Sequence, residues 1–362
     1  MSNRAILVLE DGSVYEGLSF GSQIDAYGEV VFNTSMVGYQ EILTDPSYAG
    51  QIVVPTYPLI GNYGINQQDM ESKRIQVSGF IVREECHQPN HYLNEKTIHN
   101  YLAENDIPGI WGIDTRAMTR KLRSFGVMMG KITTTKTPQQ ALKEITNSPD
   151  YGAVDFVQKV TTDKSYEWGT FDMNTTYRIV VLDCGLKYNI LRSLNQLGCR
   201  VTALPCTTPA DEILKMQPDG ILLSPGPGNP ELLDNIVDTI KKLVGKKPIM
   251  GICLGSQLIG RAFGASNFKL KFGHRGGNHP VKDLSDGHIY ITAQNHGYAL
   301  DPDTVRNGLE VSHVNLNDGT VEGVRHRELP IFAIQYHSEA SPGPLDNMYL
   351  FKKYLEMIKG EL

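Results

Sequence analysis

The chain has 362 residues, of which 40% are hydrophobic and 20% are charged, so it is long enough for two domains with buried cores. Its formal net charge is −6, whereas nucleic-acid-binding proteins carry an excess of basic residues, so we expect no nucleic-acid partner. The five cysteines form no CxxC pair, and charged residues occur too early in the N-terminal segment for a signal peptide. No apolar run is long enough to cross a membrane. We therefore predict a cytoplasmic protein without a membrane partner.

The first half, residues 1–150, is predicted to form a strand-rich α/β domain. Residues 4–12 indicate a strand that ends in an Asp-Gly turn, and residues 30–32 and 51–54 have the composition of further strands. A helix is expected over residues 95–105. A polar stretch follows over residues 133–177, with one helix near 138–145, and we interpret residues 151–176 as a linker.

The second domain, residues 177–362, shows alternating strands and helices. Strands are expected at 179–182, 201–204, 220–223 and 248–252, and helices at 189–197, 210–216 and 231–244. This alternation predicts a mainly parallel sheet with helices on both faces. From Lys269 the chain becomes strand-rich again, and it ends in a helix near 347–358. Ligands of such sheets bind beyond the carboxyl ends of the strands, where Cys253 and residues 225–228 lie.

Cys253 follows the fourth of these strands and lies between Gly251 and Gly255. Small residues at these positions allow the sharp strand-to-helix turn that exposes the nucleophile of many hydrolases. A helix N-terminus also favours the thiolate form of a cysteine. The sequence therefore predicts a nucleophile at Cys253, whereas the other cysteines of this half, which lack such a frame, are interpreted as buried structural residues: Cys184, Cys199 and Cys206.

His337 and Glu339 are two positions apart and follow a strand predicted over 332–336, so they would share one face of it. The carboxylate could then orient the imidazole as a base for the thiol of Cys253. By itself a His-x-Glu pair is more often an exposed ion pair, so this interpretation depends on Cys253.

Other motifs are less specific. Gly226 and Gly228 could present backbone amides to an oxyanion, or form an ordinary Pro-Gly turn. The chain has neither a dinucleotide-binding fingerprint nor a Walker A motif. His274 and His279 are too far apart to share a helical face. Cys86 lies near two histidines, but no second pair of potential ligands follows at the spacing of a zinc site, so we predict no metal site.

Residues 251–257, Gly-Ile-Cys-Leu-Gly-Ser-Gln, together with the His-Ser-Glu of 337–339 resemble the class I glutamine amidotransferases. Residues 271–280, 291–297 and 339–344 strengthen this resemblance, and residues 31–47 and 56–62 extend it into the first half. Together they are similar to the small, glutamine-hydrolysing subunits of carbamoyl phosphate synthetases over essentially the whole chain. The first-half match is the specific one, because other amidotransferases lack that domain.

The resemblance implies a role for each site residue. Cys253 would attack the glutamine carboxamide and form a γ-glutamyl thioester, His337 would deprotonate the thiol and help ammonia leave, and Glu339 would orient His337. Backbone N–H groups of Gly226 and Leu254 would stabilise the oxyanion. The residues implied to hold glutamine are Ser47, Gly228, Gln257, Asn295, Gly297 and Tyr298. Because Ser47 belongs to the first domain, the substrate would lie at the domain interface.

The resemblance also implies a larger partner subunit that makes carbamoyl phosphate from bicarbonate and ATP and receives ammonia through an internal tunnel. The first domain would serve partly for docking; residues 111–120 match the family there and otherwise indicate the start of a helix. We expect a heterodimer or a higher oligomer of heterodimers. ATP and Mg would bind the partner, and no cofactor is expected on this chain. The product would feed arginine or pyrimidine biosynthesis, or both.

Three positions depart from the family pattern: Ser256, Ser338 and Pro225 stand where His, Pro and Asn are usual. None removes a catalytic atom, so we expect activity, with a rate that these changes could reduce. Two alternatives compete. A stand-alone cysteine hydrolase, such as a γ-glutamyl peptidase, would need no partner, and the first domain argues against it. A non-catalytic regulatory or scaffold subunit has support only from Ser256 and Ser338.

Overall fold

The computed structural model describes residues 3–169 and 176–361. The chain divides into two compact units, Met1–Val154 and Asp155–Leu362. Part of the predicted linker carries regular structure, namely the 3₁₀ helix η2 (Tyr151–Ala153), helix α5 (Val157–Val160) and strand β10 (Tyr166–Trp168). Strand β10 belongs to the second unit because Tyr166 and Trp168 pack against its core. Linker residues 170–175 lie outside the described residues.

The first unit is built around a closed barrel whose strands follow the order β1-β2-β8-β6-β4-β3-β9. Their bounds are β1 Arg4–Leu9, β2 Val14–Gly21, β3 Ala26–Asn33, β4 Gln51–Pro55, β6 Gly79–Ile81, β8 Pro108–Trp111 and β9 Met128–Thr133. Strands β5 (Leu59–Ile60) and β7 (Glu84–Glu85) form a small separate sheet. The strand-rich character predicted for this half is confirmed, and the antiparallel pairing of β1 with β9 closes the barrel.

Three helices of the first unit begin after residues whose side chains cap them. Helix α2 (Ile98–Glu104) is shorter than predicted because the Thr97 side chain caps it by accepting the N–H of Asn100. Helix α3 (Thr115–Phe125) begins after Asp114, within the segment that indicated a helix start. Helix α4 (Pro138–Thr146) matches its prediction. The unit also contains helix α1 (Tyr39–Thr44) and the 3₁₀ helix η1 (Pro46–Tyr48).

The second unit contains one ten-stranded sheet among the described residues, in the order β10-β12-β11-β13-β14-β19-β18-β17-β15-β16. The strands are β11 Tyr177–Asp183, β12 Cys199–Pro205, β13 Gly220–Leu223, β14 Ile249–Ile252, β15 Asn267–Asp283, β16 Ile289–Leu300, β17 Leu309–Asn315, β18 Val321–His326 and β19 Ile331–Ile334. Neighbours from β12 to β19 are parallel, and antiparallel strands extend both ends. The predicted α/β class is confirmed.

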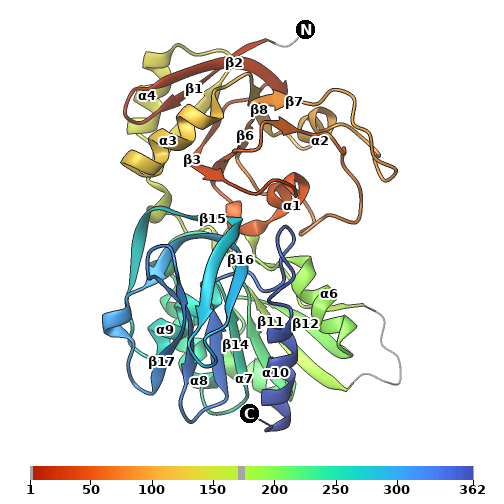
Figure 1. Ribbon diagram of the computed structural model, residues 1–362, viewed down its shortest axis with the longest axis vertical. Coiled ribbons are helices and arrows are strands. Elements are labelled where there is room, and N and C mark those ends of the chain that lie inside the picture. The colour runs from red at the N-terminus through yellow and green to blue at the C-terminus, as the bar shows by residue number, and fades with distance from the viewer. Residues whose placement is uncertain (1–2, 170–175, 362) are drawn as a thin grey trace. The chain divides into compact units, whose positions relative to one another are not determined.

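Helices cover both faces of this sheet, as Figure 1 shows. They are α6 (Tyr188–Gln196), α7 (Ala210–Lys215), α8 (Asp234–Leu243), α9 (Leu254–Ala262) and α10 (Tyr349–Lys359). Successive residues of β11 point to opposite faces, so Val180 packs with residues of α7, α8 and α9, whereas Val181 packs with residues of α6 and α10. The continuous apolar runs of the central strands follow from this two-sided burial.

The sheet register brings two chain segments together at its carboxyl edge. Ile252 of β14 pairs with Ile334 of β19, and the N–H of Cys253 donates to the Ile334 carbonyl at 2.8 Å. Strand β19 ends at Ile334, so the strand predicted through residue 336 is too long, and His337 and Glu339 do not share a strand face. His337 instead forms an isolated bridge with Ala293, and Ala340 and Ser341 then turn the chain with φ values of 57° and 53°.

No helix among the described residues has the length and apolar character needed to cross a membrane.

Candidate active site

Cys253 occupies a strained turn between β14 and α9. Its φ of 52° and ψ of −106° are unusual for a residue with a side chain, and it forms the N-cap of α9. The flanking glycines are sterically required: a Cβ at Gly255 would lie 2.4 Å from the Leu223 carbonyl oxygen, and one at Gly251 would lie 2.6 Å from Ile259 Cδ1. The predicted strand-to-helix elbow is therefore present, with the thiol at a helix N-terminus.

The sulfur of Cys253 is buried, and Gln335 and Asn295 are among its polar neighbours. The Gln335 side-chain amide donates to Sγ at 3.6 Å, and the thiol lies 3.7 Å from the carbonyl oxygen of Asn295. Gln335 also accepts from Gln257 Nε2 at 3.0 Å. Sequence reasoning missed Gln335; its position next to the pairing of β19 with β14 is the signal that places it beside the sulfur.

His337 and Glu339 form a buried pair. His337 Nδ1 lies 2.6 Å from Glu339 Oε1, and its Nε2 has no hydrogen-bond partner within the described part of the chain. Burial by itself would lower the pKa of His337, but the Glu339 carboxylate, followed by Cys253, outweighs burial and raises the pKa to about 10. His337 therefore holds a proton at neutral pH, which favours an imidazolium beside the sulfur.

A buried lysine completes this cluster. Lys187 Nζ lies 3.0 Å from Glu339 Oε1 and also donates to the carbonyl oxygen of Ala340. Burial would raise the pKa of Glu339, but Lys187 first and then His337 lower it to about 2. Lys187 is only 2% exposed and was not predicted as a site residue. Its place just after β11, at the carboxyl edge of the sheet, was the available signal, although lysines are rarely buried.

The turn that follows β13 lies against the elbow. A Cβ at Gly226 would lie 2.2 Å from the Cys184 carbonyl oxygen and 2.7 Å from Leu254 Cδ2, so the two residues predicted to donate to the oxyanion are neighbours. Gly228 has a φ of 93°, which favours glycine. The other three cysteines of this unit are buried, and burial raises the pKa of each thiol, as expected for structural residues.

Most of the predicted glutamine-binding residues lie in the same unit as Cys253. Gln257, on α9, donates to the Tyr298 carbonyl oxygen at 2.9 Å, and Asn295, Gly297 and Tyr298 all lie on β16. Ser47 belongs to the first unit, where its N–H donates to Asp45 Oδ1 at 2.9 Å. Its buried hydroxyl has no hydrogen-bond partner among the residues that the structure describes. Its role toward glutamine stays a prediction.

The departures from the family pattern are compatible with the fold. Ser256 and Ser338 are buried, and neither hydroxyl has a hydrogen-bond partner within residues 3–169 and 176–361. The carbonyl oxygen of Pro225 accepts from the Ser224 hydroxyl at 2.8 Å, which stabilises the turn. None of the three displaces Cys253, His337 or Glu339 from the cluster described above.

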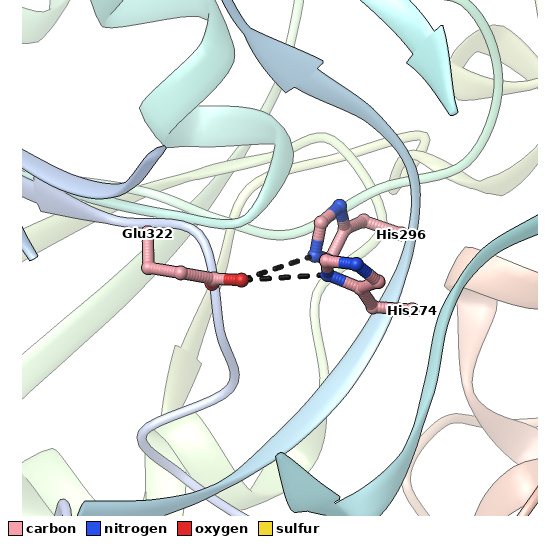
Figure 2. Close-up of side chains that lie close together, drawn as sticks. All are labelled: His274, His296 and Glu322. Atoms are coloured by element: carbon pink, nitrogen blue, oxygen red, sulfur yellow. Dashed lines mark ion pairs between the residues drawn. The ribbon is translucent and has the colours of Figure 1, made fainter. Parts of the chain in front are cut away.

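A second buried cluster joins His274 of β15, His296 of β16 and Glu322 of β18, and Figure 2 shows both imidazoles facing the carboxylate. Glu322 Oε1 lies 3.4 Å from His274 Nδ1 and 4.0 Å from His296 Nε2. Sequence spacing could not reveal this grouping, because sheet pairing brings the three residues together.

Hydrogen bonds within the chain account for this second cluster. Glu322 accepts from Asn315 Nδ2 at 2.8 Å and from Gln294 Nε2 at 3.0 Å. His274 Nε2 lies 2.8 Å from Asp318 Oδ2, and His296 Nε2 lies 2.9 Å from Gln294 Oε1. These groups satisfy one another without a cation, as buried polar groups must, so the absence of a metal site stays our prediction.

Comparison with known proteins gives matches to both halves of the chain. Residues 7–132 match the family described as carbamoyl-phosphate synthase small chain, CPSase domain, and residues 180–357 match the class-I glutamine amidotransferase family. The chain is 51% identical to the carbamoyl phosphate synthase small chain of Staphylococcus epidermidis, over 99% of this chain and 97% of that protein. It is 49% identical to the small chain of Aquifex aeolicus, over 99% of this chain and 100% of that one.

Proposed function

Because the chain belongs to the family of carbamoyl phosphate synthase small chains, we propose that it hydrolyses L-glutamine through a cysteine thioester and delivers the ammonia to a large subunit. Its class I amidotransferase domain supports glutamine hydrolysis for carbamoyl phosphate synthesis. The single observation that carries the mechanism is the cluster of Cys253, His337 and Glu339 at the carboxyl edge of the sheet.

The first half of the reaction forms the thioester. With its proton on His337, the Cys253 thiolate attacks the carboxamide carbon, and the carbonyl π electrons move to the oxygen. Backbone N–H groups of Gly226 and Leu254 stabilise that oxyanion. As the oxyanion collapses, the C–N bond breaks and His337 gives its proton to the leaving nitrogen, so ammonia departs. Glu339 holds the ring through Nδ1, which leaves Nε2 for both proton transfers.

The second half releases glutamate. Neutral His337 takes a proton from a water molecule, the resulting hydroxide attacks the thioester carbon, and the C–S bond breaks to regenerate the thiolate. The leaving thiolate again faces the His337 imidazolium, and the new carboxylic acid gives its proton to solvent, which leaves glutamate. Ser47, Gly228, Gln257, Asn295, Gly297 and Tyr298 hold the glutamine during both steps.

The chain works as one member of a heterodimer or of a higher oligomer of heterodimers, in the cytoplasm. Its large partner carries the ATP and Mg that carbamoyl phosphate synthesis requires, and this chain carries no cofactor. The first domain contributes to docking. The product feeds arginine biosynthesis, pyrimidine biosynthesis, or both. Family membership and the matching first half support these assignments over a stand-alone hydrolase.

Replacing the nucleophile tests the mechanism. Cys253→Ser in the assembled complex should abolish glutamine-dependent carbamoyl phosphate synthesis and leave ammonia-dependent synthesis intact, because ammonia bypasses the thioester. Synthesis from glutamine at the wild-type rate would show that another residue is the nucleophile. Glutaminase measured with and without the large subunit distinguishes a partnered enzyme, which the partner activates, from a stand-alone hydrolase. Covalent labelling of Cys253 by a diazoketone analogue of glutamine excludes a non-catalytic scaffold.

A further inference from the structure

We propose that Glu322 is a positioning residue for glutamine binding, whose buried carboxylate anchors a path of hydrogen bonds that ends at the side chain of Gln257. The inference rests on the proposed glutaminase function and gives a role to the second buried cluster, which the reaction steps do not use. Glu322 does not touch the reacting atoms, and it acts on the substrate only through Gln257 and the residues between them.

The first observation is that both carboxylate oxygens of Glu322 are held. Oε1 accepts from Asn315 Nδ2 at 2.8 Å and lies 3.4 Å from His274 Nδ1, and Figure 2 shows this imidazole facing the carboxylate. Oε2 accepts from Gln294 Nε2 at 3.0 Å. The side chain of Glu322 is 0% exposed, so these partners and not solvent fix its direction.

A buried carboxylate needs a compensating charge, and His274 supplies it. Burial by itself would lower the pKa of His274, but Glu322 and then Asp318 outweigh burial and raise this pKa above its ordinary value, which favours the imidazolium. His274 Nε2 lies 2.8 Å from Asp318 Oδ2, so the ring lies between two carboxylates. The charge of Glu322 is thus balanced within the cluster, and the carboxylate offers Gln294 a fixed hydrogen-bond acceptor.

The second observation is a continuous path from this acceptor along β16. Gln294 donates to Glu322 through Nε2, and its Oε1 lies 2.9 Å from His296 Nε2. The other ring nitrogen of His296, Nδ1, lies 2.8 Å from the carbonyl oxygen of Tyr298. The direction of the Gln294 amide therefore decides which group the imidazole meets, and with it how firmly the Tyr298 peptide group is held.

The path reaches the candidate active site at the Tyr298 carbonyl. Gln257 Nε2 donates to that oxygen at 2.9 Å and to Gln335 Oε1 at 3.0 Å, and the Gln335 amide donates to Cys253 Sγ at 3.6 Å. Glu322 is also tied to this end through the backbone, because its carbonyl oxygen accepts the N–H of Gln335 at 2.8 Å. Gln257 and Tyr298 are among the residues that we propose to hold glutamine, so displacement of either weakens substrate binding.

These contacts predict the effect of removing the carboxylate. Without it, Gln294 Nε2 loses its buried acceptor, and the amide turns toward another partner. We expect the effect in KM for glutamine, because Gln257 holds substrate whereas neither Glu322 nor Gln294 touches the sulfur of Cys253. A merely structural loss would instead lower kcat in proportion to the folded fraction of the enzyme and leave KM unchanged.

The experiment compares Glu322→Leu with Glu322→Gln in the complex with the large subunit. Leucine removes both acceptors, so KM for glutamine should rise about 10- to 100-fold while kcat changes less than about threefold. Glutamine keeps an acceptor for Asn315 and an amide that can bond to Gln294, so KM should stay within about threefold of the wild type. Glu310→Leu, which removes an ion pair between β17 and β18 at the surface, is the matched control and should leave both parameters unchanged.

A double-mutant cycle with Gln257→Ala tests the path itself. If Glu322 acts through Gln257, KM of the double variant should exceed that of Gln257→Ala by less than about threefold, because the side chain on which Glu322 acts is already absent. Effects of the two substitutions on KM that simply multiply would mean that no such path connects the residues.

The outcomes separate this inference from the proposed function. A wild-type KM in Glu322→Leu overturns the role of Glu322, and so does a raised KM that Glu322→Gln shares in full. If Glu322→Leu does not fold, Gln294→Leu, which interrupts the path and leaves Glu322 with Asn315 and His274, is held to the same KM criterion. Failure of the proposed function appears instead in Cys253→Ser, as glutamine-dependent synthesis that survives in an otherwise wild-type chain.

Discussion

Gln335 lies beside the sulfur of Cys253, the proposed nucleophile. Its amide donates to Cys253 Sγ at 3.6 Å, and a thiolate accepts such a bond more strongly than a thiol does. We expect Gln335→Leu to slow thioester formation about 10- to 100-fold, since a hydrogen bond to a charged group contributes about 1.5–3 kcal/mol. Single-turnover kinetics with glutamine measures this step directly.

The chain offers a matched control for that substitution. Gln158 donates to the sulfur of Cys206 at 3.8 Å in the same unit, and Cys206 is one of the buried cysteines that we interpret as structural. Gln158→Leu should leave the single-turnover rate unchanged. Equal rates for Gln335→Leu and the wild type would mean that the contact with Cys253 has no part in activating the sulfur.

At the scale of elements, the elbow between β14 and α9 depends on close contact with β13. A methyl group at Gly255 would meet the Leu223 carbonyl oxygen at 2.4 Å, and neither backbone segment can move without disturbing the sheet. We expect Gly255→Ala to destabilise the protein by about 1–3 kcal/mol and to abolish measurable glutaminase activity by displacing Cys253. Thermal unfolding and glutamine turnover test the two effects.

Gly319→Ala provides the comparison for that prediction. Gly319 has a φ of 77°, but a Cβ there would meet nothing within 4 Å, so the substitution adds backbone strain without a clash. It should cost stability and leave turnover intact. Activity of Gly255→Ala comparable to that of Gly319→Ala would contradict the steric account of the elbow.

Elements whose identity depends on local patterns were predictable from the sequence. Strands β11, β13 and β14 could be predicted because each is a short, continuous apolar run. The turn at Cys253 could be predicted because the glycines that it requires lie within two residues of it. The end of β19 was not, since the alternation of Phe332 and Ile334 continues to Tyr336, whereas the pairing with β14 stops at Ile334. Lys187 and Gln335 were also missed, because a lysine and a glutamine in sequence carry no sign of burial.

At the scale of the whole molecule, the features that sequence alone could not give are those created by long-range pairing. The pairing of β1 with β9 closes the barrel of the first unit. No local sequence pattern near Arg4 or Met128 indicates that these two strands pair. The cluster of His274, His296 and Glu322 arises in the same way from three strands. That both halves occur together in one family of chains was predictable only as a resemblance, and the match to the small chain of Staphylococcus epidermidis covers both halves.

The buried His337–Glu339 pair also links the candidate active site to global stability. The pKa of His337 is raised from 6.5 to about 10, so the contribution of this group to stability is fully present below pH 6.5 and is lost as the pH rises through 10. The pKa of Glu339 is lowered from 4.5 to about 2, so its contribution is present above pH 4.5 and is lost as the pH falls toward 2.

We therefore expect the difference in unfolding free energy between the wild type and His337→Gln to shrink steadily from pH 6.5 to pH 10. Over this range the folded wild type still holds a proton on His337 that its unfolded chain has released, whereas the variant has no such proton. Denaturant unfolding at several pH values measures that difference. His288→Gln, at an exposed histidine of the same unit, controls for the general effect of pH and should give a constant difference. A constant difference for His337→Gln as well would show that His337 is not held protonated by Glu339.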